Sequence, residues 1–148
     1  MQNIKQIAAL DTFIVRHPVL RAEKPIESCH FEGDTLETTV HFGLFETKNL
    51  LGVISLFEAK NDVFTSEKQF QIRGMAVLKQ HQKKGFGEKL IMISEKYCRN
   101  QNASLIWFNA REAAIGFYQK MGYQVKGSPF EIKNVGKHII MFKELSNE

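Results

Sequence analysis

The sequence predicts an α/β protein with a mixed sheet, and two patterns lead to this prediction. Two β-rich segments, "TTVHFGLFE" and "NLLGVISLFE", are joined by the short connection "TKN", which is typical of an antiparallel hairpin. After this hairpin, strand-like and helix-like segments alternate, as they do in α/β proteins. The 148 residues contain no internal repeat or linker, and their number suits one domain. We therefore expect residues 1–148 to form a single domain.

The segments before the hairpin carry weaker signals. Residues 1–7 are expected to form a short first strand. Residues 10–20 have apolar side chains at roughly helical spacing, although Pro18 weakens the far end of such a helix. Residues 21–34 contain a proline and the turn-forming triplet "EGD", so we expect irregular structure there.

A third strand is predicted at "QFQIRGMAVL", and its alternation breaks in the middle. Phe70 and Ile72 share one face, whereas Met75 and Val77 lie on the other. Gly74 stands at the break. Because a glycine at such a position often marks a β-bulge, we expect the strand to change direction there.

The rest of the chain alternates helix and strand. Residues 87–99 have an apolar stripe and are predicted to be helical. "SLIWFNA" is typical of a buried strand, and residues 112–121 form a second predicted helix that ends before Gly122. "YQVKG" and "HIIMFKEL" are the predicted closing strands.

Composition excludes several classes of protein. The 20 Lys and Arg against 16 Asp and Glu give a net charge of +4, and the lysines are scattered, so a nucleic-acid partner is not expected. The N-terminus lacks the order of a signal peptide, and no apolar run has the length of a membrane span. Two cysteines without a CxxC pair indicate no disulfide framework. A cytoplasmic protein without a membrane partner is the default expectation.

The segment "QKKGFG", residues 82–87, follows a strand and precedes a helix. The free N–H groups at a helix start, together with the helix dipole, favour an anion. Gly85 and Gly87 let phosphate oxygens approach the backbone, and Lys83 and Lys84 add positive charge nearby. The sequence therefore predicts a phosphate site at this turn.

Two common phosphate-binding motifs do not fit this segment. A Walker loop requires GxxxxGK[ST], which is absent from the chain. A Rossmann motif requires a third glycine where Leu90 stands, and would follow its strand more tightly. The remaining pattern is Q-x-x-G-x-G after a strand with a bulge.

Two segments together resemble the GNAT superfamily of N-acetyltransferases. "MAVLKQHQKKGFGEKL" is similar to the family's acetyl-CoA signature, [Q/R]-x-x-G-x-[G/A] after a splayed fourth strand. "NAREAAIGFYQKMGY" resembles the second family element, a helix with Phe-Tyr that ends at a glycine followed by an aromatic residue. The resemblance implies a mixed, mostly antiparallel central sheet, splayed at the fourth strand and flanked by helices.

The resemblance also implies a site for acetyl-CoA, with CoA as the product. Backbone amides of residues 82–87 would hold the pyrophosphate, and the backbone of residues 75–77 would pair with the pantetheine. Asn109 would bind the pantetheine arm, and Tyr118 would be the general acid for the leaving thiolate. The expected cofactor-binding residues are Met75, Ala76, Val77, Gln82, Lys83, Lys84, Gly85, Phe86, Gly87, Asn109 and Phe117.

The chemistry implied is direct attack by an amine on the thioester. That reaction requires a neutral amine, a polarised carbonyl and a proton for the leaving thiolate. It requires no protein nucleophile and no metal. The alternative is a module that binds acyl-CoA without catalysis, because the sequence supplies cofactor signals but no clear base.

The chain departs from the family pattern at positions that concern the pantetheine contacts and the base. Arg111 stands where many relatives have Asn, seven residues before the tyrosine. The fourth strand carries Gln69, Gln71 and Arg73 where many relatives have a glutamate base. His138 begins the last strand and is the candidate base or acceptor contact, with a structural role as the alternative.

The segment "RHPVLRAEKP" resembles the N-terminal segment of an uncharacterised GNAT subgroup. In that fold it would overhang the acceptor side. Arg16 and Arg21 could bind an acidic group or face solvent, and the sequence favours solvent. The sequence names no acceptor beyond a primary amine of a small molecule or peptide, and it leaves a homodimer open.

Overall fold

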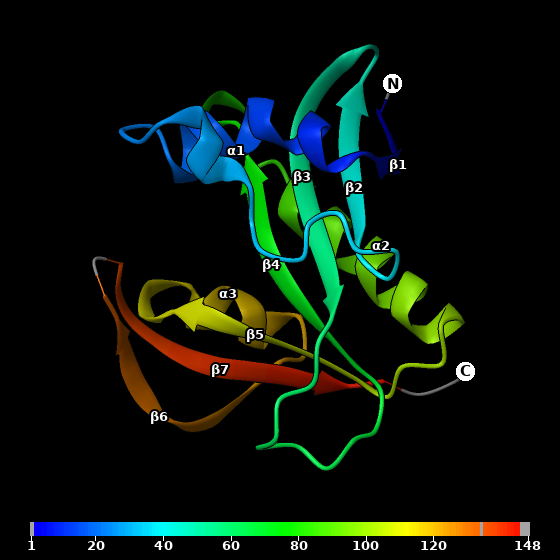
Figure 1. Ribbon diagram of the computed structural model, residues 1–148, viewed down its shortest axis with the longest axis vertical. Coiled ribbons are helices and arrows are strands. Elements are labelled where there is room, and N and C mark those ends of the chain that lie inside the picture. The colour runs from blue at the N-terminus through cyan, green and yellow to red at the C-terminus, as the bar shows by residue number, and fades with distance from the viewer. Residues whose placement is uncertain (1, 134, 146–148) are drawn as a thin grey trace. The chain divides into compact units, whose positions relative to one another are not determined.

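The computed structural model describes residues 2–133 and 135–145 (Figure 1). The described residues form a seven-stranded sheet with the strand order β1-β2-β3-β4-β5-β7-β6. The strands are β1 (Gln2–Ile7), β2 (Val40–Glu46), β3 (Asn49–Glu58), β4 (Gln69–Val77), β5 (Leu105–Arg111), β6 (Gln124–Ile132) and β7 (Gly136–Glu144). The helices are α1 (Phe13–Leu20), α2 (Phe86–Asn100) and α3 (Ile115–Lys120), with 3₁₀ helices η1 (Ala9–Thr12), η2 (Ile26–Cys29), η3 (Lys79–His81) and η4 (Glu112–Ala114).

This architecture confirms the predicted fold class, a mixed and mostly antiparallel sheet with helices. The chain divides into two compact units. Unit 1 is Met1–Glu58 with Ile72–Tyr97, and unit 2 is Ala59–Gln71 with Cys98–Glu148. Across both units, every helix in the described part of the chain is too short or too polar to cross a bilayer.

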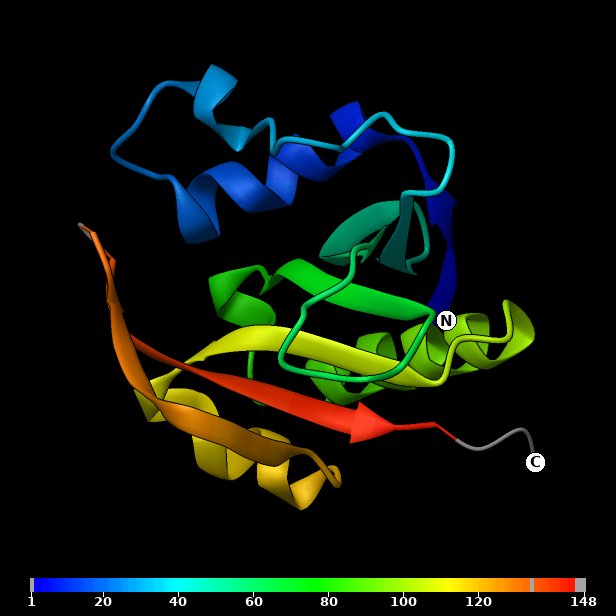
Figure 2. The same cartoon turned by 60° about the horizontal axis from the view of Figure 1, so that its bottom comes forward.

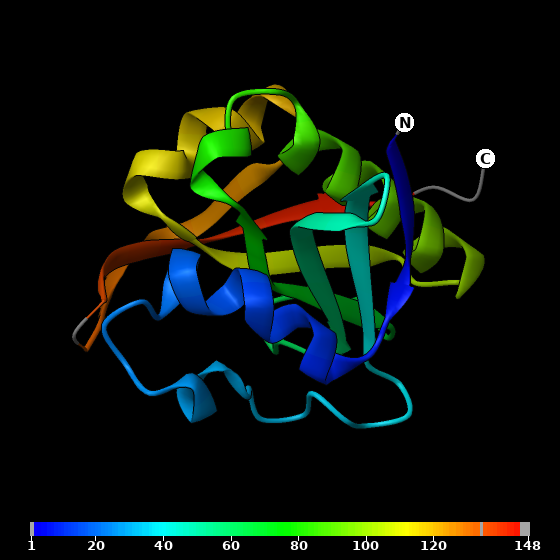
Figure 3. The same cartoon turned by 90° about the horizontal axis from the view of Figure 1, so that it is seen from above.

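Unit 1 is built on the antiparallel strands β1, β2 and β3. The β2–β3 hairpin pairs Glu46 with Asn49 and turns at Thr47, whose φ of 58° is left-handed, so the predicted hairpin is confirmed. The segment from α1 to β2 returns alongside α1 on the same side of these strands (Figure 3). Helix α1 contains Pro18 and still reaches Leu20, the predicted end, so the proline does not shorten it.

Helices α1 and α2 cover opposite faces of the unit 1 strands (Figure 2). Val53 of β3 packs with Val15 of α1 in a core cluster. The preceding residue of the strand, Gly52, faces the other way, and a Cβ there would lie 3.2 Å from the Leu90 side chain of α2. Glycine at this position therefore allows α2 to pack closely on the sheet.

Unit 2 contains the antiparallel strands β5, β7 and β6, and the start of β4. The parallel register of β4 with β5 runs from Gln69↔Leu105 to Gln71↔Trp107. The two faces of β5 are covered differently: Trp107 packs with Phe64 of the β3–β4 loop, whereas Phe108 packs with Tyr118 of α3. The indole N–H of Trp107 donates to the Ala59 carbonyl at 2.9 Å, which fixes that loop.

Strand β6 extends beyond its predicted end. The segment "YQVKG" suggested a strand that stops at Gly127, but β6 continues past Pro129 to Ile132. Its pairing with β7 shifts register between Lys126 and Phe130, and Gly127 has a left-handed φ of 77°. Because β6 is an edge strand with a bulge, it tolerates a proline that lacks the N–H of an inner strand.

Candidate active site

The break in β4 occurs at Gly74, as its sequence pattern predicted. Gly74 has a left-handed φ of 65°, and a Cβ there would lie 2.8 Å from the ring of Phe31. Glycine is therefore required both by the backbone and by the close approach of the ring. After the break, Ala76 is buried in a core cluster, while Met75 and Val77 are half-buried. Because its side chain is buried, Ala76 can offer a ligand only its backbone.

The turn before α2 has the geometry of an anion site. Lys83 and Gly85 both have left-handed φ angles, 65° and 83°. The first helical hydrogen bond of this turn runs from the Lys89 N–H to the Gly85 carbonyl at 3.2 Å, so the amides of residues 86–88 have no acceptor within the helix. A Cβ on Gly85 would meet no atom within 4 Å, which means that this side of the turn is open. The helix begins at Phe86, one residue before the predicted start.

The side chains of this turn have different roles from one another. The Gln82 side-chain amide donates to the Val77 carbonyl at 2.9 Å, which ties the turn to the end of β4. Lys83 and Lys84 are exposed, and the Lys84 ammonium lies 3.4 Å from Nδ1 of His81. The ring of Phe86 is buried beside His81, so Phe86 can offer a ligand its backbone but not its ring.

In unit 2, Tyr118 packs in an aromatic cluster on α3. Its ring centroid lies 4.4 Å from that of Phe108 and 5.1 Å from that of Phe117. Burial raises the pKa of the Tyr118 phenol above its ordinary value, so the hydroxyl stays protonated. Within residues 2–133 and 135–145 this hydroxyl has no hydrogen-bond partner. Tyr118 therefore holds a proton that no neighbour in this part of the chain accepts.

Asn109 and Tyr118 lie on opposite faces of β5. The side chains of Phe108 and Asn109 alternate across the strand, and Tyr118 covers the Phe108 face. Asn109 is exposed and pairs with Ile140 of β7. The structure therefore does not bring these two predicted site residues to one face of the strand.

His138 is buried between neighbouring strands. It stands opposite Arg111 of β5 and Phe130 of β6. Its Nδ1 lies 2.8 Å from the Gly136 carbonyl, which can only accept, so the neutral ring carries its proton on Nδ1. The lone pair is then on Nε2. This arrangement orients the ring, and it leaves one nitrogen able to accept a proton.

The structure contains a buried polar cluster that the sequence did not predict. Arg16 is fully buried, so the expectation that it faces solvent is wrong. Its guanidinium donates to the Asp34 carboxylate at 2.7 and 3.1 Å, to the Cys29 carbonyl at 2.7 Å and to the Ser55 hydroxyl at 2.9 Å. We call Arg16, Asp34, His41 and Ser55 the Arg16 cluster.

His41 completes the cluster as a neutral ring. Its Nε2 donates to the Asp34 carbonyl at 2.9 Å, and its Nδ1 accepts from the Ser55 hydroxyl at 2.6 Å. Burial lowers the pKa of His41 below its ordinary value. Burial alone would raise the pKa of Asp34, but hydrogen bonds from Arg16 and from the Phe31 N–H outweigh it and lower that pKa. The sequence signal was two polar residues, His41 and Ser55, within otherwise apolar strands.

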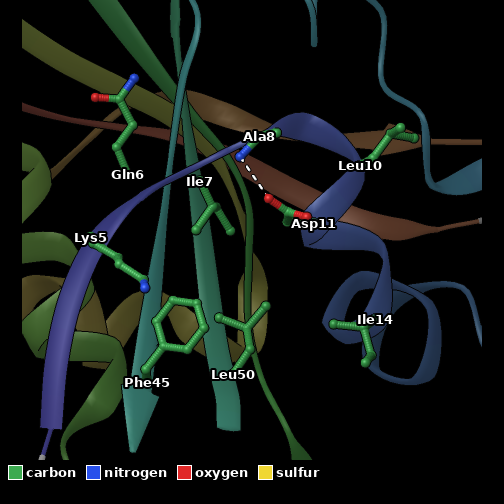
Figure 4. A pocket seen from close by; sticks show the side chains of 9 residues that line it. All are labelled: Lys5, Gln6, Ile7, Ala8, Leu10, Asp11, Ile14, Phe45 and Leu50. Atoms are coloured by element: carbon green, nitrogen blue, oxygen red, sulfur yellow. Dashed lines mark hydrogen bonds between the residues drawn. The ribbon is translucent and has the colours of Figure 1, made fainter. Parts of the chain in front are cut away.

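Unit 1 also has a surface hollow of about 890 Å³ beside β1, η1 and α1 (Figure 4). Leu10 and Ile14 line it with exposed apolar side chains. The Ala8 N–H donates to the Asp11 carboxylate at its edge, at 3.0 Å. None of the site residues predicted from the sequence lines this hollow.

Comparison with known proteins identifies the family. The sequence profile of the acetyltransferase (GNAT) family matches residues 3–123. The uncharacterised N-acetyltransferase YitI of Bacillus subtilis is 32% identical over 145 residues, which cover 98% of this chain and 97% of that protein.

Solved structures agree in fold. The ribosomal-protein-S18-alanine N-acetyltransferase of Escherichia coli superposes with a TM-score of 0.78 at 17% identity, with 99% of this chain and 95% of that chain covered. An acetyltransferase of Bacillus subtilis in complex with CoA superposes with a TM-score of 0.70 at 15% identity, with coverage of 99% and 100%. The profile match over most of the chain and the likeness to YitI carry the assignment: the chain belongs to the acetyltransferase (GNAT) family.

Proposed function

We propose that this chain is an N-acetyltransferase that moves an acetyl group from acetyl-CoA to a primary amine of a small molecule or peptide. Family membership supports acyl transfer from a CoA-type donor in general. The single observation that supports the donor site most is the turn before α2, with its free amides and its open glycine. We also propose that residues 1–148 act as one GNAT domain, because the family profile runs through both units.

The turn binds the CoA pyrophosphate. Amides of residues 82–87 donate to the phosphate oxygens, and the partial positive charge of the α2 N-terminus adds to the attraction. Lys83 and Lys84, both exposed, contribute a screened attraction to the same group. The backbone of Met75, Ala76 and Val77 pairs with the pantetheine. On this proposal Asn109 and Phe117, both exposed in unit 2, contact the same donor.

The reaction is one displacement at the thioester carbonyl. The lone pair of the neutral amine attacks the acetyl carbon, and the C–S bond breaks as the new C–N bond is completed. Tyr118 gives its proton to the departing thiolate. The raised pKa of Tyr118 suits this role, because the phenol enters the reaction protonated. The amine nitrogen must lose one proton in the same reaction.

His138 is the candidate base for that proton. Its Nδ1–H is held by the Gly136 carbonyl, so Nε2 is the nitrogen with a free lone pair. The fourth strand offers no carboxylate for this task, since its polar side chains are Gln69, Gln71 and Arg73. A proton taken by Nε2 would leave the ring hydrogen-bonded at Nδ1.

A thiol-release assay tests the function. The protein is mixed with acetyl-CoA and a panel of primary amines, and free CoA thiol is measured against time. The proposal predicts release that depends on both the protein and the amine, with the acetylated amine found by mass spectrometry. Tight CoA binding without transfer to any amine would instead favour a non-catalytic acyl-CoA-binding module.

A further inference from the structure

Three guanidinium groups surround the ring of Phe31 in unit 1. The Cζ atoms of Arg16, Arg73 and Arg21 lie 3.9, 5.0 and 5.5 Å from the ring centroid. Arg16 belongs to α1, Arg21 follows its last residue, and Arg73 belongs to β4. Phe31 itself is buried. The fold thus gathers three positive charges from separate parts of unit 1 on one aromatic ring.

One of the three charges is neutralised inside the protein. Arg16 forms a buried ion pair with Asp34, at 2.7 Å, and both side chains are fully buried. In the described part of the chain, the Nε of Arg16 is the buried side-chain atom that lacks a hydrogen-bond partner. It faces the β4 backbone at Gly74, where a Cβ would lie 3.3 Å from it. Arg16 thereby holds the Phe31 ring against the break in β4.

The other two charges have no ion-pair partner within residues 2–133 and 135–145. Arg73 is half-buried and also lies 5.2 Å from the Phe57 ring centroid. Burial lowers the pKa of Arg73, the charges of Arg16 and Arg21 add to that shift, and the nearby Asp34 and Glu32 carboxylates oppose it. Arg21 donates to the Leu20 carbonyl at 3.3 Å and keeps most of its N–H groups free.

A half-buried guanidinium without a carboxylate at ion-pair distance is costly, because more distant carboxylates offset its desolvation only in part. Its planar set of N–H donors matches a carboxylate, and two arginines beside an aromatic ring can hold one carboxylate between charge and apolar surface. Arg73 stands two residues before Met75, with the break at Gly74 between them. An anion bound at Arg73 would thus lie next to the strand segment that the proposed function assigns to the acyl donor.

We propose that Arg73 and Arg21 bind a carboxylate carried by the acceptor, so that the substrate class is amines with an acidic group, such as amino acids or acidic peptides. This inference rests on the proposed function. Arg16 and Asp34 are positioning residues in it, because they hold Phe31 without reaching the ligand. The charged pair holds the acid group, and the amine of the same molecule lies toward Met75 to Val77 on β4.

Matched substrate pairs test the inference. Glycine, β-alanine and phenylalanine are each compared with their amides, which keep the amine and lose the negative charge. In the wild-type protein, at least one carboxylate should be acetylated with a higher kcat/KM than its amide. In Arg73→Gln, that carboxylate should lose roughly 10- to 100-fold in kcat/KM, as expected for a lost charge-assisted hydrogen bond. The amide should change little, and so should the KM for acetyl-CoA.

Two further variants serve as controls. Lys48→Gln removes one exposed charge from the β2–β3 turn of unit 1 and should leave the preference unchanged. Arg21→Gln should weaken the preference in the same direction as Arg73→Gln, and it decides the matter if Arg73→Gln does not fold. Aminomethylphosphonate shows whether the pair selects carboxylate or binds any oxyanion. Folding of each variant is checked by circular dichroism.

The outcomes separate this inference from the proposed function. Equal loss for carboxylate and amide in both arginine variants, or no wild-type preference for any carboxylate, would overturn the inference and leave N-acetylation standing. If no amine is acetylated, calorimetric titration with N-acetylglycine and N-acetylglycinamide in the presence of CoA decides. If the wild-type protein binds N-acetylglycine but not N-acetylglycinamide, and Arg73→Gln binds neither, the anion site is upheld while the catalytic proposal fails. If the wild-type protein binds neither compound, or binds both equally, the anion site is overturned as well.

Discussion

The Arg16 cluster and the turn at residues 82–88 are both rich in hydrogen-bonding groups, and they differ in where those groups find partners. In the cluster, Arg16, Asp34, His41 and Ser55 bind one another or the nearby backbone. In the turn, the amides of residues 86–88 have no helical acceptor. The cluster is buried and the turn is largely exposed.

The difference teaches how to separate stability from binding in this protein. Removing a group from the cluster leaves a buried partner unpaired, so it should lower the free energy of unfolding. Blocking the turn removes no internal bond, so beyond any backbone strain it should act on ligand affinity. The following predictions test whether the two regions can be separated in this way.

The largest effect is expected from Asp34→Asn. This change leaves the fully buried Arg16 charge without its counter-ion. We expect the free energy of unfolding to fall by about 3–5 kcal/mol, the usual cost of breaking a buried pair from one side. Urea denaturation followed by circular dichroism measures it.

Asp62→Asn is the matched control, since Asp62 is exposed and should tolerate the same change. A loss in Asp34→Asn no larger than that of the control would contradict the structural role of the cluster.

The next effect concerns catalysis. Tyr118→Phe keeps the ring that packs on Phe108 and removes the hydroxyl proton. We expect kcat to fall by roughly 10²-fold, within the range of a positioned general acid. CoA affinity and thermal stability should change little, because the hydroxyl has no partner in the described part of the chain. Steady-state kinetics with an identified acceptor measures the change.

Full turnover in a folded Tyr118→Phe protein would end the general-acid assignment. Phe117→Leu is a useful companion, because Phe117 is more exposed and carries no proton. A large loss of stability in Tyr118→Phe would show that the hydroxyl is structural.

The smallest effect is a pH dependence of stability from His41. Its pKa in the folded state lies below the ordinary value of about 6.5, so the unfolded chain binds a proton more readily. The stabilisation is complete above pH 6.5 and declines as the pH falls toward the folded-state pKa. For one proton the slope is at most about 1.4 kcal/mol per pH unit. The pKa of Asp34 is lowered from 3.8, so its contribution to stability is lost only when the pH falls below about 3.8.

Urea denaturation between pH 4.5 and 7.5 measures this slope, and His41→Gln should flatten it. His81→Gln is the control, because His81 is only half-buried and lies outside the Arg16 cluster. An unchanged slope in His41→Gln would show that His41 is not the group that titrates.

The sequence predicted those parts of the fold whose signals are local. The β2–β3 hairpin, the break at Gly74 and the start of α2 within one residue all follow from patterns a few residues long. The continuation of β6 past Pro129 could not be predicted, because it depends on the edge position and the register shift against β7.

The Arg16 cluster was missed for a related reason. It joins residues 16, 34, 41 and 55, and no short pattern connects them before the chain is folded. A polar residue in an apolar strand, such as His41, could signal that a partner is needed, but not which one. In the same way, only the structure separates Asn109 from Tyr118 by the face of β5.

The most direct test of the account is a calorimetric titration of CoA into wild-type protein, Gly85→Val and Gly127→Val. Both glycines have left-handed φ angles, 83° and 77°, and a Cβ at either would meet no protein atom within 4 Å. The two variants should therefore lose similar stability from backbone strain, on the order of 1–2 kcal/mol. We predict a CoA affinity about tenfold or more weaker in Gly85→Val alone, since only its side chain would block phosphate at the α2 N-terminus. Unchanged affinity in a folded Gly85→Val protein, or an equal loss in Gly127→Val, would contradict the phosphate site.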